Sequence, residues 1–276
     1  MDIRLGCDFT FELAADSDAL VVVEPHEDDT ATVRDATFRT SPASESSVYV
    51  DRFGNRIRRL SLHAGRSSLY FDAVAEVSND ADVNCVGLEG HAPSALPEQT
   101  LEFLLPSRYC ESDVLLSEVV GRFGGAPMDG QRVQDICDWV HHHIRFDYTS
   151  SSPLHTAASV YRERTGVCRD FTHLAVAMCR ALSVPARYVC GYLPDIGVPD
   201  PATPMDFCAW MEVYLGDRWC TFDPRNNERR VGRVVVSRGR DAADCAMVTT
   251  FGPATLVEMH VVAERADTHA ALATSA

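Results

Sequence analysis

The spacing of apolar residues changes near residue 105 from strand-like to partly helical, and this change limits the folds that the sequence can adopt. Up to about residue 105, apolar and polar residues alternate, as from Cys7 to Leu13, which is the pattern of half-buried strands. From residue 114 onward, many apolar residues recur at intervals of three or four, which is helical spacing. The pattern predicts an α+β protein with an N-terminal β-sandwich over 1–105 and a second, mixed domain over 106–265.

Individual elements follow from the same patterns and from turn residues. Gly and Asn between two β-branched runs predict a hairpin around residue 54, and Pro-rich sequence predicts a loop over 195–204. The tail over 266–276 is rich in Ala and Thr and is expected to be disordered. Strands are expected near 7–13, 19–24, 48–50, 57–60, 69–77, 186–193, 231–237 and 254–263, and helices near 114–123, 133–144, 156–164, 168–182 and, as a short one, 241–246.

Charge and cysteine usage narrow the class of protein. A formal net charge of −15 argues against nucleic acid or an anionic membrane as a partner, because both require basic surfaces. No apolar run reaches transmembrane length, and residues 1–16 lack the apolar core of a secretion signal. The ten cysteines are scattered without a CxxC pair, which favours a reduced, cytoplasmic protein over a disulfide framework. No EF-hand loop occurs, so neither calcium nor another cofactor is expected.

The stretch from Thr165 to Ala175 holds the first candidate for chemistry. Gly166 permits a sharp turn, and Cys168 follows it at the expected start of a helix. Free amides and the positive end of the helix dipole favour a thiolate there and could hold an oxyanion. The competing interpretation is a small apolar residue packed under the helix, because free cysteines are commonly buried.

A hairpin over 206–223 holds the second candidate. Two alternating runs flank Gly216 and Asp217, and a two-residue turn pairs Leu215 with Arg218. The same register brings Asp223 opposite Trp210 and makes it a diagonal neighbour of Cys208, about 7–8 Å away between β-carbons. We therefore expect positions 208 and 223 to form a side-chain pair.

Histidines were considered as bases for a nucleophilic cysteine. The run from His141 to His143 cannot converge on one ion, because consecutive helical residues point about 100° apart. His173 follows Cys168 on the same helix but lies about 140° around the axis, so it points elsewhere. His155 could approach from the preceding loop and His141 to His143 from another helix, and the sequence places none of them relative to Cys168.

Three segments together resemble the transglutaminase-like superfamily, in particular its bacterial members with a β-rich N-terminal domain. They are GVCRDFTHLA at 166–175, PARYVCGY at 185–192 and DFCAWMEVYLGDRWCTFDPRNN at 206–227. The resemblance implies a papain-like core, with helices on an antiparallel sheet, and a Cys-His-Asp triad. It implies that Cys168 is the nucleophile and Asp223 the orienting carboxylate, while Cys208 occupies the family's histidine position.

Two functions stay open at this stage. As an enzyme, the protein would transfer or hydrolyse an acyl group from a glutamine carboxamide or peptide amide through a thioester on Cys168. Arg169 and Trp210 are then the candidates for substrate binding, Arg169 by its charge beside the thiol and Trp210 as a groove-wall aromatic. As an inactive, redox or metal-binding member, the protein would use the Cys168 and Cys208 pair and serve in protein interaction. In both cases the partner is a protein or peptide, and the sequence does not give the oligomeric state.

Overall fold

The N-terminal strands form two facing sheets, as the alternating pattern predicts. The computed structural model describes residues 1–26, 30–199, 201 and 203–266. Both sheets contribute apolar side chains to one core, for example Phe9 and Leu69 from one sheet and Leu62 from the other. The strands are β1 (Asp2–Leu13), β2 (Ser17–Val21), β3 (Ala31–Ser41), β4 (Ser46–Val50), β5 (Arg56–Leu62) and β6 (Gly65–Val77), and of these only β3 had no counterpart among the expected strands.

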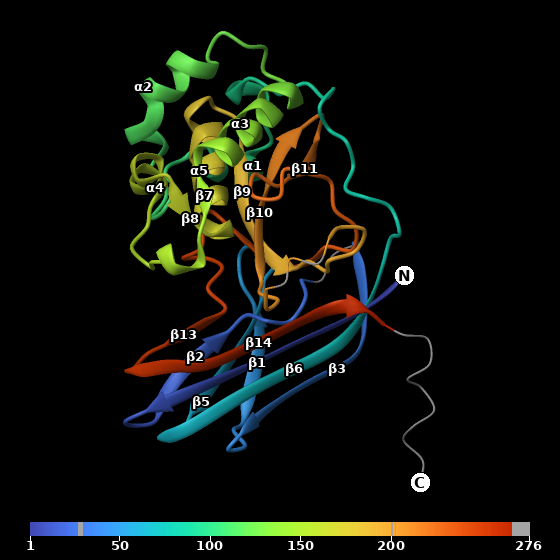
Figure 1. The fold of residues 1–276 in the computed structure, drawn as a ribbon, viewed down its shortest axis with the longest axis vertical. Helices are drawn as coiled ribbons and strands as arrows, with labels where there is room; N and C mark the ends of the chain where they lie inside the picture. The colour runs from blue at the N-terminus through green and yellow to red at the C-terminus, as the bar shows by residue number, and fades with distance from the viewer. Residues whose placement is uncertain (27–29, 200, 202, 267–276) are drawn as a thin grey trace.

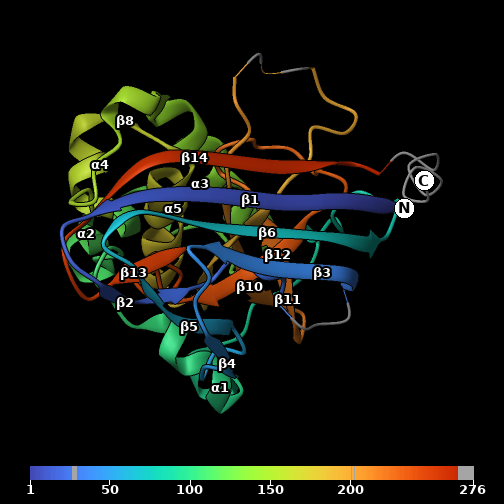
Figure 2. The ribbon, with the colours of Figure 1, turned by 90° about the horizontal axis from the view of Figure 1, so that it is seen from below.

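Two strands from the end of the described chain complete this sandwich. The sheet orders are β14-β1-β6-β3 and β13-β2-β5-β4, where β13 is Val248–Thr250 and β14 is Ala254–Arg265. Figure 2 shows β14 running beside β1 along its length, and their register joins Ile3 to Arg265. The division into 1–105 and 106–265 as domains stays a prediction, but the sheet pairing assigns β13 and β14 to the N-terminal sheets. Sequence position alone could not reveal this pairing, because it joins distant segments.

Helices and short turns occupy the middle of the chain and lie on the opposite side of the molecule from the sandwich (Figure 1). The four longer helices begin within three residues of the positions that helical spacing predicts, and Thr156 caps the third of them through its side chain, whereas the short helix at Glu98–Leu101 was not expected. The elements are 3-10 turns at Pro93–Ala95, Glu102–Leu104 and Tyr148–Ser150, helices α1 (Glu98–Leu101), α2 (Ser112–Phe123), α3 (Gly130–His143), α4 (Ala157–Glu163) and α5 (Cys168–Ala181), and the short paired strands β7 (Arg145–Phe146) and β8 (Thr165–Gly166).

A third antiparallel sheet carries the predicted hairpin. Its order is β11-β10-β9-β12, formed by β9 (Ala186–Tyr192), β10 (Cys208–Leu215), β11 (Arg218–Phe222) and β12 (Val234–Gly239). Leu215 pairs with Arg218, so the predicted hairpin register is confirmed. Helix α5 packs on β9 and β10, and the family's helix-on-sheet core is present.

The short helix expected near 241–246 is absent, and this expectation was wrong. The segment forms a turn in which Asp241 Oδ1 accepts from the Ala243 backbone N–H at 2.9 Å. The other carboxylate oxygen accepts from the Tyr109 backbone N–H at 2.8 Å. An aspartate that bonds nearby backbone groups offers an alternative to helical hydrogen bonds, and here that alternative prevails.

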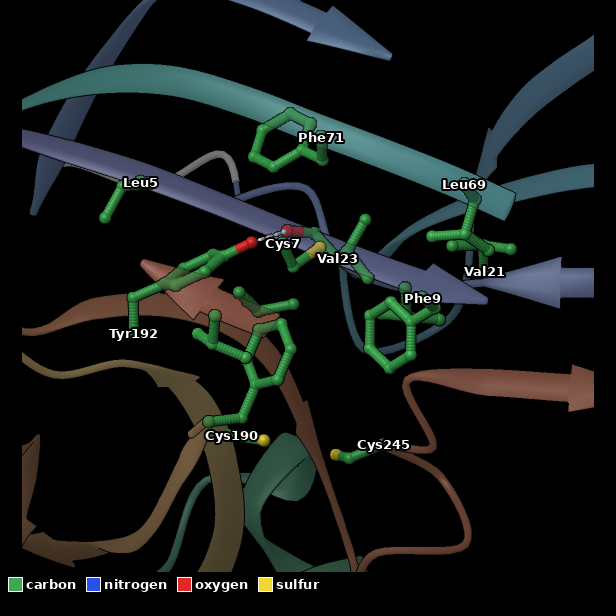
Figure 3. Packing of buried hydrophobic residues seen from close by; sticks show 14 of the residues in the cluster. Leu5, Cys7, Phe9, Val21, Val23, Leu69, Phe71, Cys190, Tyr192 and Cys245 are labelled. Carbon is green, nitrogen blue, oxygen red and sulfur yellow. Dashed lines mark hydrogen bonds between the residues drawn. The ribbon is translucent and has the colours of Figure 1, made fainter. Parts of the chain in front are cut away.

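The third sheet packs against the sandwich through one continuous core. Figure 3 shows Tyr192 of β9 reaching toward Cys7 of β1, and Cys190 of β9 belongs to the same core cluster as Phe9 of β1. Tyr192 donates its hydroxyl hydrogen to the Val23 carbonyl at 3.1 Å, which satisfies the buried phenol. The sandwich therefore supports the sheet that carries position 208.

The ten cysteines are all free, and eight of them are buried. This agrees with the expectation that most of them serve as small core residues. Cys168 and Cys208 are the two that retain partial exposure. The expected disordered tail at 266–276 lies outside the described residues except for Ala266. No helix in the described part of the chain is both long and apolar enough to cross a lipid bilayer.

Candidate active site

Cys168 is the first residue of α5, where the sequence predicts it. Asp170 closes the helix start by accepting from the Val167 backbone N–H at 2.9 Å. Gly166 is required beside this cap, because an added β-carbon would lie 2.7 Å from the Asp170 β-carbon. The backbone N–H groups of Cys168 and Arg169 fall in the first turn, where no helical carbonyl can reach them. The turn thus presents a thiol and two amide donors at the same point.

Cys168 and Cys208 line one cavity of about 150 Å³, together with Tyr148, Asp206 and Asn226 among others. The Cys168 thiol donates to the Phe207 carbonyl at an Sγ–O distance of 3.9 Å. The Cys208 thiol donates to the Ala209 carbonyl at an Sγ–O distance of 3.8 Å, and the nearby Cys168 thiol together with burial raises the pKa of Cys208 well above its ordinary value. Cys208 is therefore held as a neutral thiol next to the candidate nucleophile.

The wall of this cavity is attached to the sandwich at two points. The Phe207 ring stacks on Phe9 of β1 with 6.2 Å between ring centroids. Met205, which lines the cavity, accepts at its sulfur from the Ala263 backbone N–H of β14 at 2.9 Å. The segment that leads into β10 is thus positioned by both β1 and β14.

Asp223 lies buried at the end of β11, within a set of donors that the sequence did not indicate. Arg233 donates from Nη2 to Asp223 Oδ2 at 2.8 Å and from Nε to Asp82 Oδ2 at 2.8 Å. The Arg225 and Asn226 backbone N–H groups donate to Asp223 Oδ1 at 3.1 and 2.8 Å. Burial acts to raise the pKa of Asp223, but the Arg233 charge and the hydrogen bonds from Asn226 outweigh it, so the pKa is lowered.

Asn226 stands between Asp223 and Cys208. Its side-chain nitrogen lies 2.8 Å from Asp223 Oδ2 and 3.9 Å from Cys208 Sγ. The expected pairing of positions 208 and 223 is thus made through an amide, since no direct bond between their side chains occurs in the described residues. The signal that could have revealed Asn226 is the Asp-Pro-Arg-Asn sequence, because an aspartate that ends a strand often accepts from the backbone just after it.

The two candidate substrate-binding residues lie outside the lining of this cavity. Trp210 is 1% exposed, with the Arg233 guanidinium 4.8 Å from its ring centroid. Arg169 donates to Asp170 Oδ1 at 3.2 Å from Nε and to the Ser152 carbonyl at 2.6 Å from Nη2. Trp210 therefore packs beneath Arg233, and Arg169 braces the start of α5. Substrate binding by either residue stays a prediction.

The histidines considered as bases have other partners. His173 is fully buried between Tyr109 and Tyr188, with ring centroids 5.1 and 5.0 Å away, which confirms that it points away from the thiol. His155 lies with Nε2 3.3 Å from Glu163 Oε2. The rings of His141, His142 and His143 contact the Arg225, Asp138 and Tyr161 carbonyls respectively, so they do not converge. No histidine is found among the described residues that line the Cys168 cavity.

A metal site was the remaining possibility for the thiol pair. In the described part of the chain, no group of three or more His, Cys, Asp or Glu side chains is arranged to hold a metal ion. Asp223 is already bonded to Arg233 and Asn226, and Cys208 contacts a thiol and an amide. The cavity residues therefore form a hydrogen-bonded thiol site.

The fold and site define a papain-like thiol protein, and comparison with known proteins gives the family. The model of the transglutaminase-like superfamily matches residues 117–224. A crystal structure from Cytophaga hutchinsonii, provisionally described as a cysteine protease, is 31% identical, with a TM-score of 0.86 over 97% of this chain and 91% of that one. The chain belongs to the transglutaminase-like superfamily.

Curated relatives come from mycobacteria and are themselves uncharacterized. A Mycobacterium leprae protein is 24% identical over 213 residues, which is 75% of this chain and 76% of that protein. A Mycobacterium tuberculosis protein is 38% identical over 114 residues, only 36% of its own length. The first of these relatives matches most of the chain, whereas the second matches a shorter part of it.

Proposed function

We propose that this protein is a cysteine-dependent acyltransferase or amidase that acts on a glutamine carboxamide or a peptide amide. The observation that carries the proposal is the position of Cys168, which is the first residue of α5 and lines a cavity. The partly exposed thiol lies beside two backbone N–H groups that lack helical acceptors. This is the arrangement required for a nucleophile and its oxyanion donors.

In the first step, the Cys168 sulfur attacks the amide carbon and forms a bond to it. The carbonyl oxygen becomes an oxyanion, which the N–H groups of Cys168 and Arg169 stabilise. The carbon–nitrogen bond then breaks, and ammonia or an amine leaves with one added proton. Attack on the resulting thioester by an amine completes transamidation, and attack by water completes hydrolysis.

Asp206 is the group that we propose for proton transfer in these steps. It lines the cavity while remaining exposed to solvent, and it accepts a hydrogen bond from the Phe207 backbone N–H at 2.7 Å. Desolvation raises the pKa of this carboxyl, although the Phe207 bond acts in the opposite direction. A carboxyl with a raised pKa can give a proton to the leaving amine and take one from the second nucleophile.

A protein or peptide is the proposed substrate, because the family acts on side-chain or backbone amides. A reducing cytoplasm is the proposed compartment, since all ten cysteines are free thiols. The proposal does not require a cofactor.

The competing function is a catalytically inactive member that binds a protein partner. It is favoured by the presence of Cys208 where the family has histidine and by Asp223 being bonded to Arg233. Under this alternative the cavity would bind a peptide without cleaving it.

Turnover measurements separate the two functions. Ammonia release and incorporation of a labelled primary amine are measured on a glutamine-containing peptide with reduced protein. We expect Cys168→Ala to abolish both, while Cys179→Ala, on the same helix but fully buried, retains them. Turnover that survives Cys168→Ala, or its absence in folded wild-type protein over a panel of peptides, would overturn the proposal.

A second pair of variants tests the role of Asp206. Asp206→Asn is expected to lower turnover by about a hundredfold, the usual scale for loss of an acid–base group, and to flatten its pH profile. Asp195→Asn is the matched control, because Asp195 lines the same cavity but pairs with Arg230 at 3.0 Å. If both substitutions lower turnover equally, Asp206 would contribute only to the negative charge of the cavity and not to proton transfer.

A further inference from the structure

The two cysteines at the cavity differ from the other eight in accessibility. Cys168 and Cys208 are partly exposed, whereas every other cysteine in the chain is buried. Both line the same cavity, so a small solute that reaches one sulfur also reaches the other. Accessibility and thiolate character together determine which cysteines in a protein are oxidised.

The Cys168 thiol donates to the Phe207 carbonyl and has a second thiol, that of Cys208, in the same cavity lining. Cys208 lies beside Cys168 in the cavity lining, and its polar neighbours are the Ala209 carbonyl at 3.8 Å and Asn226 Nδ2 at 3.9 Å. Cys168 is the first residue of α5, beside backbone N–H groups that lack helical acceptors, and its side chain is partly exposed. One sulfur is thus placed as the reactive thiol and the other as a resolving thiol.

We propose that Cys168 and Cys208 form a reversible disulfide when the protein meets a hydroperoxide, and that this bond withdraws the nucleophile from the cavity. The chemical part of the proposal needs only the two sulfurs and the oxidant. The regulatory part, loss of acyl transfer, rests on the proposed function of Cys168.

The reaction balances in two steps. In the first step, the Cys168 thiolate attacks the hydroperoxide, and an S–O bond forms as the O–O bond breaks. The alcohol leaves after taking up a proton, and Cys168 is then a sulfenic acid. The Cys208 sulfur attacks the Cys168 sulfur, an S–S bond forms as the S–O bond breaks, and the hydroxyl leaves with the Cys208 proton as water. The hydroperoxide gains the two electrons that the sulfurs lose. A dithiol reverses the bond by thiol–disulfide exchange and is itself oxidised.

The chain contains a second thiol pair that serves as an internal control. Figure 3 shows the sulfurs of Cys190 and Cys245 facing each other across the core. These residues are only 7% and 3% exposed, and burial raises the pKa of both thiols. If proximity alone decided oxidation, both pairs would respond; if accessibility decides, only Cys168 and Cys208 respond.

The experiment treats fully reduced protein with hydrogen peroxide at near-equimolar amounts and measures three quantities. We expect the intact mass to fall by two hydrogens and peptide mapping to find Cys168 linked to Cys208. Iodoacetamide labelling of Cys168 should fall about tenfold or more and recover with dithiothreitol. Cys208→Ser should show no bridge, and its Cys168 should instead form a dimedone adduct and proceed to the sulfinic acid.

Three results would overturn the inference. The first is a stable Cys168 sulfenic or sulfinic acid in the wild-type protein, and the second is a Cys190–Cys245 disulfide that forms equally fast. The third is a rate of iodoacetamide labelling at Cys168 that peroxide leaves unchanged. Amide turnover of the reduced protein is measured separately beforehand. A bridge without any turnover refutes the proposed function and leaves the disulfide established. Turnover without a bridge refutes the disulfide alone.

Discussion

Arg233 holds Asp223 in a buried ion pair, with Arg233 Nη2 2.8 Å from Asp223 Oδ2 and side-chain exposures of 6% and 1%. The same guanidinium also contacts Asp82, so one cation joins two carboxylates. Both oxygens of the Asp223 carboxylate therefore accept hydrogen bonds from groups other than the side chain at position 208. This gives Asp223 a structural role that does not depend on catalysis.

Acid should weaken the fold through Asp223. The pKa of this carboxyl is lower in the folded protein than its ordinary value, so the folded state binds the proton less readily than the unfolded state. Its stabilisation is complete above the ordinary carboxyl pKa and is lost as the pH falls through the folded-state value. Urea unfolding between neutral and acid pH should show this loss.

Asp223→Asn is the variant that checks this linkage. It should cost about 3–5 kcal/mol at neutral pH, because it breaks a buried pair and leaves Arg233 with one carboxylate. It should also reduce the acid dependence of the unfolding free energy. The exposed Asp135→Asn serves as the control. An Asp223→Asn protein that keeps the wild-type acid dependence would contradict the assignment.

Asn226→Ala should remove the connection between Asp223 and Cys208. We expect a loss of about 1–3 kcal/mol of stability, because a hydrogen bond to a charged group is lost. Alkylation of Cys168 should also change rate, since Cys208 loses its amide neighbour. Asn227→Ala is the matched control: Asn227 donates to Asp138 instead, at 2.9 Å, so its loss should affect stability without altering Cys168. A rate of alkylation equal in both variants would argue against the connection.

Cys208→His should restore a base at the family's histidine position. An imidazole in contact with Cys168 is expected to raise amide turnover by about a hundredfold and to shift iodoacetamide labelling of Cys168 to lower pH. Cys208→Ser, which supplies no base, should leave the pH profile of labelling as it is in the wild-type protein. If the Cys208→His protein is folded but has the turnover and labelling profile of Cys208→Ser, the side chain at position 208 is not placed to accept a proton from Cys168.

Gly191→Ala should disturb the same sheet by overpacking. Gly191 pairs with Cys208 in the β9–β10 register, and an added β-carbon would lie 2.2 Å from the Val234 carbonyl oxygen and 2.8 Å from Trp210 Cη2. We expect a loss of about 1–3 kcal/mol in thermal or urea unfolding. Gly121→Ala on α2 meets no atom within 4 Å and should instead stabilise by about 0.5–1 kcal/mol. If the two substitutions change the free energy of unfolding in the same direction, the result would be inconsistent with this packing.

Local signals in the sequence predicted the parts of the site that are close in the chain. The turn at Gly216 and Asp217 was enough to give the hairpin register, and Gly166 with helical spacing was enough to place Cys168 at the start of α5. Both features depend on neighbouring residues only, so their physical causes are visible in the sequence.

The remaining features depend on contacts between distant segments. Arg233 precedes β12 and reaches Asp223 only because β12 pairs with β9, next to the hairpin. Asp82 joins the same cluster from a segment far earlier in the chain. No periodicity or turn signal reports such a charge cluster, because its members share neither an element nor a spacing.

The pairing of β14 with β1 also determines when the cavity can be completed during translation. β1 emerges from the ribosome early. Its neighbour β14, including the Ala263 amide that donates to Met205, is made only after α5 and the sheet that carries position 208. A nascent chain that stops before residue 254 can form α5 and its cysteine, yet it lacks β14, one of the two strands that position the cavity wall. The order of synthesis therefore keeps the thiol in an unfinished site until the sandwich closes.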